Sequence, residues 1–172
     1  MVRVVDDFIP NLFMNRVNSL LEGNTFNWFW NSNTTEHHND NNFMFTHILF
    51  PNESNKSPHF DFFVPIVYII DRHNPVKDLV RMKLNLYTNQ GKRIDHASHY
   101  DMVEEGKPVD NVMTTILNFT TCNGGTIIGE EKYLSKGNQA LSFDNEIEHQ
   151  GFTQTDTQRR IVLNIATTNT TK

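Results

Sequence analysis

The chain has 172 residues, 37% of them hydrophobic and 13 of them phenylalanine, so it can bury the core of one domain and is not disordered throughout. Its formal net charge of -5 argues against a protein dedicated to nucleic acid, because phosphate contacts usually leave a basic surface. A nucleobase substrate bound in a local basic groove is still compatible with this charge.

The single cysteine and the N-terminus limit the location of the protein. Cys122 alone forms no internal disulfide and no zinc site of several cysteines. Residues 1–7 contain no long apolar run, and no stretch reaches membrane-spanning length. We therefore expect a cytoplasmic location (the host cytoplasm for a phage-encoded protein) and no membrane partner. Nothing in the sequence indicates an oligomeric state.

A first helix is predicted after Pro10, which suits a first helical turn, and its predicted end is Gly23. The apolar side chains that recur with helical spacing and form one face are Phe13, Val17, Leu20 and Leu21. The aromatic run 26–30 is expected to pack rather than to bind a ligand. Residues 31–42 are polar and predict a surface loop.

A second helix is predicted at residues 60–72. The apolar side chains that would cluster on one side of it are Phe62, Phe63, Ile66, Ile69 and Ile70. A buried strand is the alternative, since a short apolar run fits both structures.

After residue 75 the pattern changes from helical to extended. Strands are predicted at 80–87, 112–119, 139–143 and 160–168, with turns at 123–125 and 136–138. The Thr-rich tail, 167–172, is expected to fray. Because the helices precede the strands and do not alternate with them, a parallel doubly wound sheet is disfavoured. A small antiparallel sandwich or jelly roll fits better.

The predicted fold class is therefore mainly β with N-terminal helices (α+β). We expect one domain over residues 1–172, with a helical part at about 1–75 and a jelly-roll core at about 76–168. The sequence contains no internal repeat and no domain linker.

Among the eight histidines, His99 stands in a His-x-Asp arrangement, His99-Tyr100-Asp101. On a strand, positions i and i+2 point to the same face, so His99 and Asp101 can both reach one metal ion. The motif alone arises easily by chance. A facial triad of two histidines and one carboxylate needs a third ligand from a distant strand. His149, which follows the strand predicted at 139–143, is the candidate for that ligand.

A basic pair, Arg159 and Arg160, opens the last predicted strand. An arginine that enters the core of a sandwich is costly unless it meets an anion. A dicarboxylate would supply that anion in a bidentate geometry. Because neighbouring strand residues point to opposite faces, at least one of the two arginines is expected at a solvated strand start.

Further motifs accompany these residues. In chain order the sequence carries Val5-Asp6-Asp7-Phe8-Ile9-Pro10, Asn27-Trp28-Phe29, Arg81-x-Lys83-x-Asn85-Leu86-Tyr87, His99-x-Asp101, Asn123-Gly124-Gly125-Thr126, Phe143-Asp144-Asn145-x-x-x-His149-x-Gly151 and Arg160-Ile161-Val162-Leu163-Asn164. In this order and spacing the chain resembles the iron(II)/2-oxoglutarate-dependent dioxygenases over nearly its whole length. It is most similar to the small prolyl-hydroxylase-like forms of phages and marine bacteria.

This resemblance implies a double-stranded β-helix, a cupin-like jelly roll with the metal at its open end. It implies that His99, Asp101 and His149 bind Fe(2+), with 2-oxoglutarate at two of the remaining positions and O2 at the third. The implied reaction couples oxidative decarboxylation of 2-oxoglutarate to succinate with oxidation of a substrate C–H bond. The metal and cosubstrate carry the difficult chemistry, and the protein orients and shields it.

The resemblance also suggests how the cosubstrate is held. Relatives place an arginine directly before the Ile-Val-Leu-Asn run, which favours Arg160 over Arg159 as its carboxylate partner. Tyr87 stands where relatives often have a tyrosine that hydrogen-bonds 2-oxoglutarate, and a packed strand tyrosine is the alternative. His96 is expected at the rim of the site or on the surface. The histidines of the segment 37–40 are expected on the surface.

Other functions stay open. One is a metal-binding cupin-like isomerase or sensor without oxygenase activity, against which Arg160 argues. Another is a structural jelly roll, such as a virion component. Among oxygenases a hydroxylase is favoured, and the presence of Asp101 argues against a halogenase. The substrate class is open between a protein side chain, a nucleobase and a small molecule. Residues 103–108 are the first choice for a substrate-facing loop, with a solvated charge run as the alternative.

Overall fold

The computed structural model describes residues 1–35, 42–51 and 55–170. In chain order its elements are β1 (Arg3–Val5), α1 (Asn11–Glu22), β2 (Phe29–Asn31), β3 (Met44–Phe50), α2 (Phe60–Phe63), α3 (Pro65–His73), β4 (Val76–Thr88), β5 (Val103–Glu104), β6 (Lys107–Pro108), β7 (Val112–Asn118), β8 (Gly125–Ile128), β9 (Glu131–Leu134), β10 (Gln139–Asp144), β11 (His149–Phe152) and β12 (Arg159–Asn169).

The strands form a large sheet, a small sheet and a hairpin. The large sheet has seven strands in the order β1-β10-β7-β12-β4-β3-β2, and the small sheet has three in the order β11-β8-β9. All pairings between neighbouring strands are antiparallel. β5 and β6 pair only with each other. The mainly antiparallel architecture predicted from the sequence is thus confirmed.

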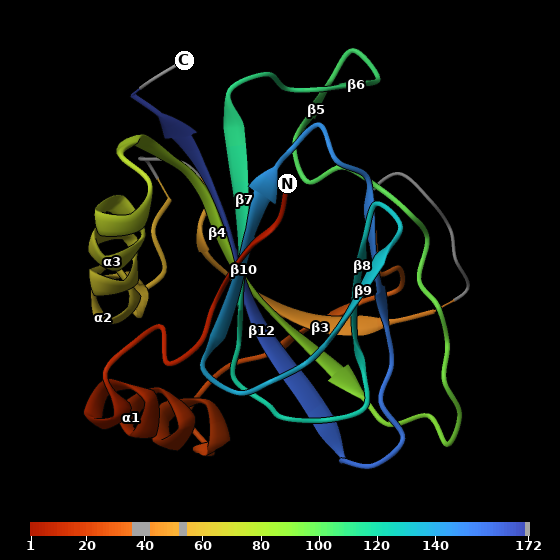
Figure 1. Cartoon of the computed structure of the whole chain (residues 1–172). Coiled ribbons are helices and arrows are strands. Elements are labelled where there is room, and N and C mark those ends of the chain that lie inside the picture. The colour runs from red at the N-terminus through yellow and green to blue at the C-terminus, as the bar shows by residue number, and fades with distance from the viewer. Residues whose placement is uncertain (36–41, 52–54, 171–172) are drawn as a thin grey trace.

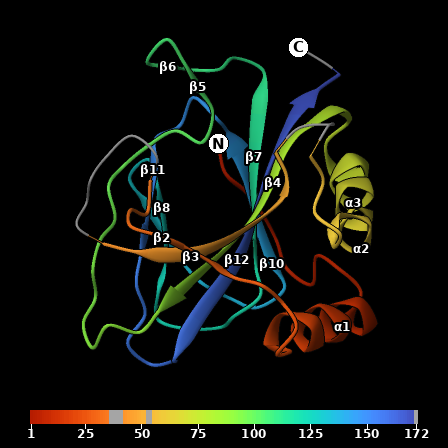
Figure 2. The same cartoon turned by 180° about the vertical axis from the view of Figure 1, so that it is seen from behind.

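The large sheet has a different cover on each face. Figures 1 and 2 show the three helices on one side of it and the small sheet, β8, β9 and β11, on the other. The helical side holds the larger core, which includes Val17, Phe63, Ile66, Leu84 and Leu163. Between the sheets lies a smaller cluster that includes Tyr87, Ile116, Phe143 and Val162. The site described below lies on the side of this smaller cluster.

The predicted helices are present. α1 buries Met14, Val17 and Leu21 along one face, as its spacing indicated. The helix predicted at 60–72 forms as two helices, α2 and α3, which meet at Val64–Pro65. A proline has no N–H to donate and fits best in the first turn of a helix, so Pro65 begins α3. None of the helices described is both long and apolar enough to span a membrane.

The first 75 residues also contain strands. β1 pairs with β10, and β3 and β2 extend the large sheet beyond β4. The strand β3 was not predicted, because five of its seven residues are buried and its sequence does not alternate. The strands predicted at 80–87, 112–119, 139–143 and 160–168 correspond to β4, β7, β10 and β12.

Two predictions about exposed segments were wrong. In the predicted surface loop 31–42, the described residues Thr34, Thr35 and Asn42 are buried, and Thr34 and Thr35 line a hollow with Arg81 and Lys83 of β4. Residues 36–41, including the histidines of segment 37–40, lie outside the described residues. The tail does not fray at its start, because Thr167 pairs with strands on both sides and is 1% exposed.

Candidate metal centre

His99 and His149 lie directly opposite each other. They form an isolated antiparallel bridge at the edge of β11, with backbone hydrogen bonds of 2.9 and 3.0 Å between the two residues. Directly opposed residues point to the same face of a sheet, and the two imidazole ring centroids are 4.4 Å apart. Asp101 follows two positions after His99. One ligand atom from each of the three side chains lies within 4.8 Å of the others.

The Asp101 carboxylate is held by several donors. Arg81 Nη2 forms an ion pair with Oδ1 at 2.8 Å, and Asn164 Nδ2 lies 2.9 Å from both oxygens. The Thr114 hydroxyl donates to Oδ2 at 3.0 Å. These contacts fix the direction in which the carboxylate points, as the outer partners of metal ligands commonly do.

The charge states suit a divalent cation. Burial acts to raise the pKa of Asp101, but nearby His149 and Arg81 outweigh it and hold that pKa well below the usual range. Burial, followed by the proximity of His149, lowers the pKa of His99 to about 4. At neutral pH Asp101 is therefore an anion and His99 a neutral imidazole. His99 Nδ1 lies 3.1 Å from the Ala97 carbonyl oxygen, so a proton there leaves Nε2 for a metal.

Arg160 is buried on the face of the large sheet that also carries the site of His99, Asp101 and His149. Its residue is 1% exposed, and its Nη2 donates to Thr126 Oγ1 at 3.0 Å and, over 3.5 Å, to Asn118 Oδ1. Its guanidinium carbon lies 5.5 Å from the centre of the Tyr87 ring. Among the described residues no carboxylate pairs with it and its Nε has no acceptor. Burial lowers the pKa of Arg160, which is the expected response of a cation that lacks an anion.

One narrow cavity, about 40 Å³ in volume, joins Arg160 to the triad. Its walls come from β4, β12, β7 and the small sheet, and they include Tyr87, Asn85, Thr126, Arg160, His99, Asp101 and His149. The Asn85 residue is 7% exposed, and its Oδ1 has no partner among the described residues. Five of the six side chains predicted for the metal and the cosubstrate therefore line one space: His99, Asp101, His149, Arg160 and Tyr87.

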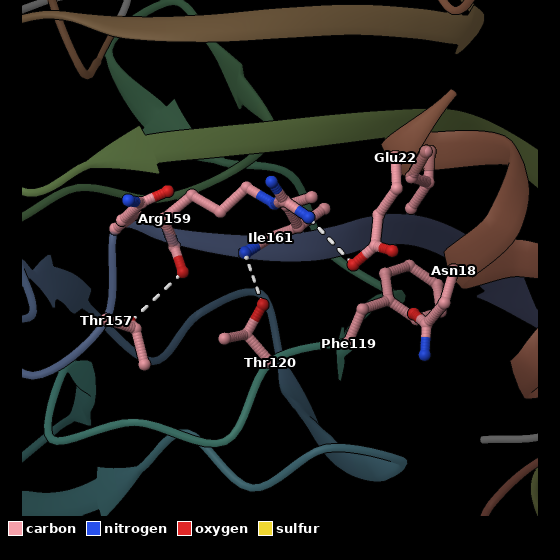
Figure 3. Close-up of a pocket in the computed structure, with 9 residues that line it drawn as sticks. Asn18, Glu22, Phe119, Thr120, Thr157, Arg159 and Ile161 are labelled. Atoms are coloured by element: carbon pink, nitrogen blue, oxygen red, sulfur yellow. Dashed lines mark hydrogen bonds and ion pairs between the residues drawn. The ribbon is translucent and has the colours of Figure 1, made fainter. Parts of the chain in front are cut away.

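Arg159 lies elsewhere. Its side chain points to the opposite face of β12 and forms an ion pair with Glu22 of α1 at 2.7 Å. Figure 3 shows this pair at the edge of a separate pocket of about 430 Å³, near Phe119, Thr120 and Ile161. The alternation of neighbouring strand residues thus sends Arg160 into the cavity and Arg159 away from it.

His96 is not at the rim or on the surface. It is 4% exposed, and its ring lies 4.9 Å from the Tyr87 ring. The backbone of Gly151 approaches so closely that a Cβ there would lie 2.7 Å from His96 Nδ1. The expectation of an exposed histidine was wrong, because it ignored the room that a glycine on the neighbouring strand provides.

The segment 103–108 forms the hairpin β5–β6, with Glu105 and Gly106 at positive φ in its turn. It lines a cleft of about 450 Å³ together with Ser98, His99, Tyr100 and Glu148. Ser98 and Tyr100 flank His99, so by strand alternation they point away from the face that His99 shares with Asp101. The hairpin therefore shares a cleft with one of the three triad residues, and its substrate-facing role stays a prediction.

The sequence reasoning did not identify Arg81, Lys83, Asn85 and Asn164 as site residues. The signal was available, because polar residues occupy alternate positions 81, 83, 85 and 87 of β4. Here the polar face of β4 points into the molecule, which is typical of a functional cavity.

Comparisons with known proteins bear on the fold. No family model matches the chain, and no curated protein sequence matches it. Solved structures do match. A 2OG-Fe(II) oxygenase family oxidoreductase from Burkholderia pseudomallei superposes with a TM-score of 0.73 and 7% identity, over 97% of this chain and 85% of that one.

Two prolyl hydroxylases are also similar. The viral collagen prolyl hydroxylase of Paramecium bursaria Chlorella virus-1, in its 2OG complex, gives a TM-score of 0.60 and 13% identity, over 96% of this chain and 94% of that one. A Pseudomonas putida prolyl-4-hydroxylase gives a TM-score of 0.63 and 9% identity, over 99% of this chain and 93% of that one. The structural neighbours of this chain are thus members of the 2OG-Fe(II) oxygenase family, and over nearly its whole length the chain has their fold.

Proposed function

We propose that the protein is an iron(II)- and 2-oxoglutarate-dependent oxygenase, and that it acts as a hydroxylase. The observation that carries the proposal is a single cavity lined both by a His-Asp-His cluster and by a buried arginine that has no acidic partner among the described residues. The distribution of its strands over two facing sheets supports a double-stranded β-helix, with residues 1–172 as one domain.

The residues present fit the metal. Two imidazole nitrogens and one carboxylate are the donor set of the facial triad that binds non-haem iron(II) and leaves open positions. Asp101 is already oriented by Arg81 and Asn164. His99, Asp101 and His149 would therefore hold the ion without a large rearrangement.

The residues at the other end fit a dicarboxylate. Arg160 would bind the distal carboxylate, with the Thr126 hydroxyl beside it. Tyr87 lies 5.5 Å from the guanidinium and lines the same cavity, and Asn85 lies two positions before Tyr87 on the same face of β4. The cavity is smaller than a five-carbon dicarboxylate, so binding requires side chains such as Lys83 to rotate outward.

Bound iron(II) and 2-oxoglutarate supply the oxidising chemistry, the coupling of decarboxylation to oxidation of a C–H bond. The protein contributes position and charge. Arg81, Asn164 and Thr114 hold Asp101 in one orientation. Burial keeps His99 neutral, and Arg160 would hold the distal carboxylate of the cosubstrate. A hydroxylase is favoured because the carboxylate ligand is present and because two of the neighbours described above are prolyl hydroxylases.

The test is spectroscopic. Iron(II) and then 2-oxoglutarate are added without oxygen to the purified protein, and the visible metal-to-ligand charge-transfer band is recorded. We expect a band in the wild type, none in His149→Ala, and one in Arg160→Ala only at much higher 2-oxoglutarate. Arg159→Ala is the matched control and should behave as the wild type. Absence of the band in the wild type, with no iron retained, would rule out the oxygenase and favour a structural jelly roll.

A further inference from the structure

The cavity of the candidate metal centre contains a side-chain amide that the fold does not use. Asn85 of β4 lines this cavity, and the residue is 7% exposed. Its Oδ1 has no hydrogen-bond partner among the described residues, and none of them accepts a hydrogen bond from its Nδ2. Buried side-chain amides are nearly always hydrogen-bonded, and the exceptions commonly have a functional role. The amide of Asn85 is therefore available to a ligand.

The strand register places this amide within reach of a ligand of Arg160. Val162 of β12 pairs with Asn85 of β4 on one side and with Asn118 of β7 on the other, and directly opposed residues share a face. We call these three residues the middle row. Arg160 stands two positions before Val162, yet its Nη2 lies 3.5 Å from Asn118 Oδ1. Its guanidinium carbon lies 5.5 Å from the centre of the Tyr87 ring, on the strand of Asn85. A carboxylate bound by this guanidinium would therefore lie over the middle row.

The middle row also lies between Arg160 and the metal ligands. The next residue of β12 on this face is Asn164, whose Nδ2 lies 2.9 Å from Asp101 Oδ1. Two positions of a strand advance by about 6.6 Å, so the middle row is one such step from Arg160 and one from Asn164. A dicarboxylate that joins Arg160 to the metal therefore crosses the middle row, where Val162 is apolar and Asn85 offers a polar group.

We propose that Asn85 determines the specificity of the cosubstrate site, and that its Nδ2 donates a hydrogen bond to the distal carboxylate held by Arg160. This proposal rests on the oxygenase function proposed above. No hydrogen bond to a described residue holds the amide in one orientation, so rotation about Cβ–Cγ can turn Nδ2 toward the ligand. A carboxylate accepts about four hydrogen bonds, and the Arg160 guanidinium, the Thr126 hydroxyl and the Asn85 amide would donate to it from three different strands. An uncharged end group would leave these buried donors unpaired. The site should therefore select 2-oxo acids that carry a second carboxylate.

The test compares the binding of two 2-oxo acids of equal chain length. 2-Oxopentanoate has the metal-binding end of 2-oxoglutarate but a methyl group in place of the distal carboxylate. Both acids are titrated without oxygen into the iron(II) protein, and Kd is obtained from the visible charge-transfer band. In Asn85→Leu we expect Kd to rise about tenfold or more for 2-oxoglutarate, the effect of losing one hydrogen bond to a charged group, and to stay the same for 2-oxopentanoate. Asn18→Leu, the same change in α1, is the matched control and should bind both acids as the wild type does.

Two readouts separate this role from a structural one. The ligand-free Asn85→Leu protein should unfold at the same urea concentration as the wild type or at a higher one, because the change removes a buried amide that has no partner among the described residues. In the zinc(II) protein, the side-chain amide signal of Asn85, identified in NMR spectra by its absence from Asn85→Leu, should shift when 2-oxoglutarate is added.

The outcomes separate the two proposals. An unchanged Kd for 2-oxoglutarate in Asn85→Leu, or an Asn85 amide signal that does not move at saturating 2-oxoglutarate, overturns the inference and leaves the oxygenase function standing. Equal weakening of both acids would place Asn85 at the metal-binding end of the cosubstrate and also overturn it. A lower urea midpoint of ligand-free Asn85→Leu would assign the amide to the fold and contradict the inference. A wild type that forms no band with iron(II) and 2-oxoglutarate fails at the earlier step, the proposed function itself.

Discussion

Replacing Arg160 with methionine should stabilise the ligand-free protein and abolish its stabilisation by 2-oxoglutarate. The guanidinium is buried, with one hydrogen bond of 3.0 Å to Thr126 and no carboxylate partner among the described residues. Exchanging buried ionic groups for apolar side chains of similar size is often neutral or gains about 1–4 kcal/mol. Leaving the Thr126 hydroxyl without its donor costs about 1 kcal/mol. Subtracting this cost from a gain of about 1–4 kcal/mol leaves an expected net gain of about 0–3 kcal/mol, at about 2–4 °C in Tm per kcal/mol for a chain of this size.

The assay is urea unfolding of the ligand-free and zinc(II)-loaded proteins, the latter with and without 2-oxoglutarate. At a hundred times its Kd, the cosubstrate should add about 2.7 kcal/mol to the free energy of unfolding of the wild type and nothing to that of the variant. Arg159→Met is the control: its ion pair with Glu22 is largely exposed, so the change should stay below about 1 kcal/mol. If ligand-free Arg160→Met loses more than about 2 kcal/mol instead, the arginine serves the fold and the reasoning is refuted.

Three further predictions concern the same region. Asn164→Leu removes both amide contacts to Asp101 and should lower metal affinity about 10- to 100-fold without unfolding the protein, measured by competition with a chelating dye. Because the pKa of His99 is lowered from 6.5 to about 4, the unfolded chain binds more protons than the folded one between these values, and stability falls as the pH drops through this window. At pH 5 the loss is about 2 kcal/mol; it should be absent from His99→Gln when unfolding curves at pH 7 and pH 5 are compared. In Gly125→Ala the new Cβ would lie 2.1 Å from the Tyr133 carbonyl oxygen, so we expect a loss of about 3 kcal/mol or more, and wild-type stability of this variant would contradict the close approach.

The parts of the site that follow strand alternation could be predicted from the sequence. The i, i+2 spacing of His99 and Asp101 predicted a shared face, and the structure brings both side chains to His149. Alternation also required the two arginines to diverge, and Arg160 is the one that enters the cavity. Each of these inferences depends on the alternation of neighbouring strand residues and on a known chemical requirement: a third ligand for the metal, or an anion for a buried arginine.

The parts that depend on distant neighbours could not be predicted. The strand β3 is buried on both faces, so no period of two marks it. Thr34 and Thr35 are polar, and only the sheet beneath them makes them buried. His96 lies inside the molecule because Gly151, 55 residues later, has no side chain. In each case the deciding partner is far away in the sequence and carries no local pattern.

The bridge between His99 and His149 has a consequence for local unfolding. Asp101 and His149 are tied to well-paired parts of the protein, whereas His99 belongs to a segment that contacts β11 through isolated bridges at Asp95 and His99. Opening this segment breaks few backbone hydrogen bonds and should occur far more readily than global unfolding. A metal ion bound by His99, Asp101 and His149 would hold the segment closed. Metal binding and closure of the segment would then stabilise each other by linkage. The metal affinity of the protein therefore includes the free energy of closing this one stretch of chain, and amide hydrogen exchange in residues 95–99 should slow when the metal binds.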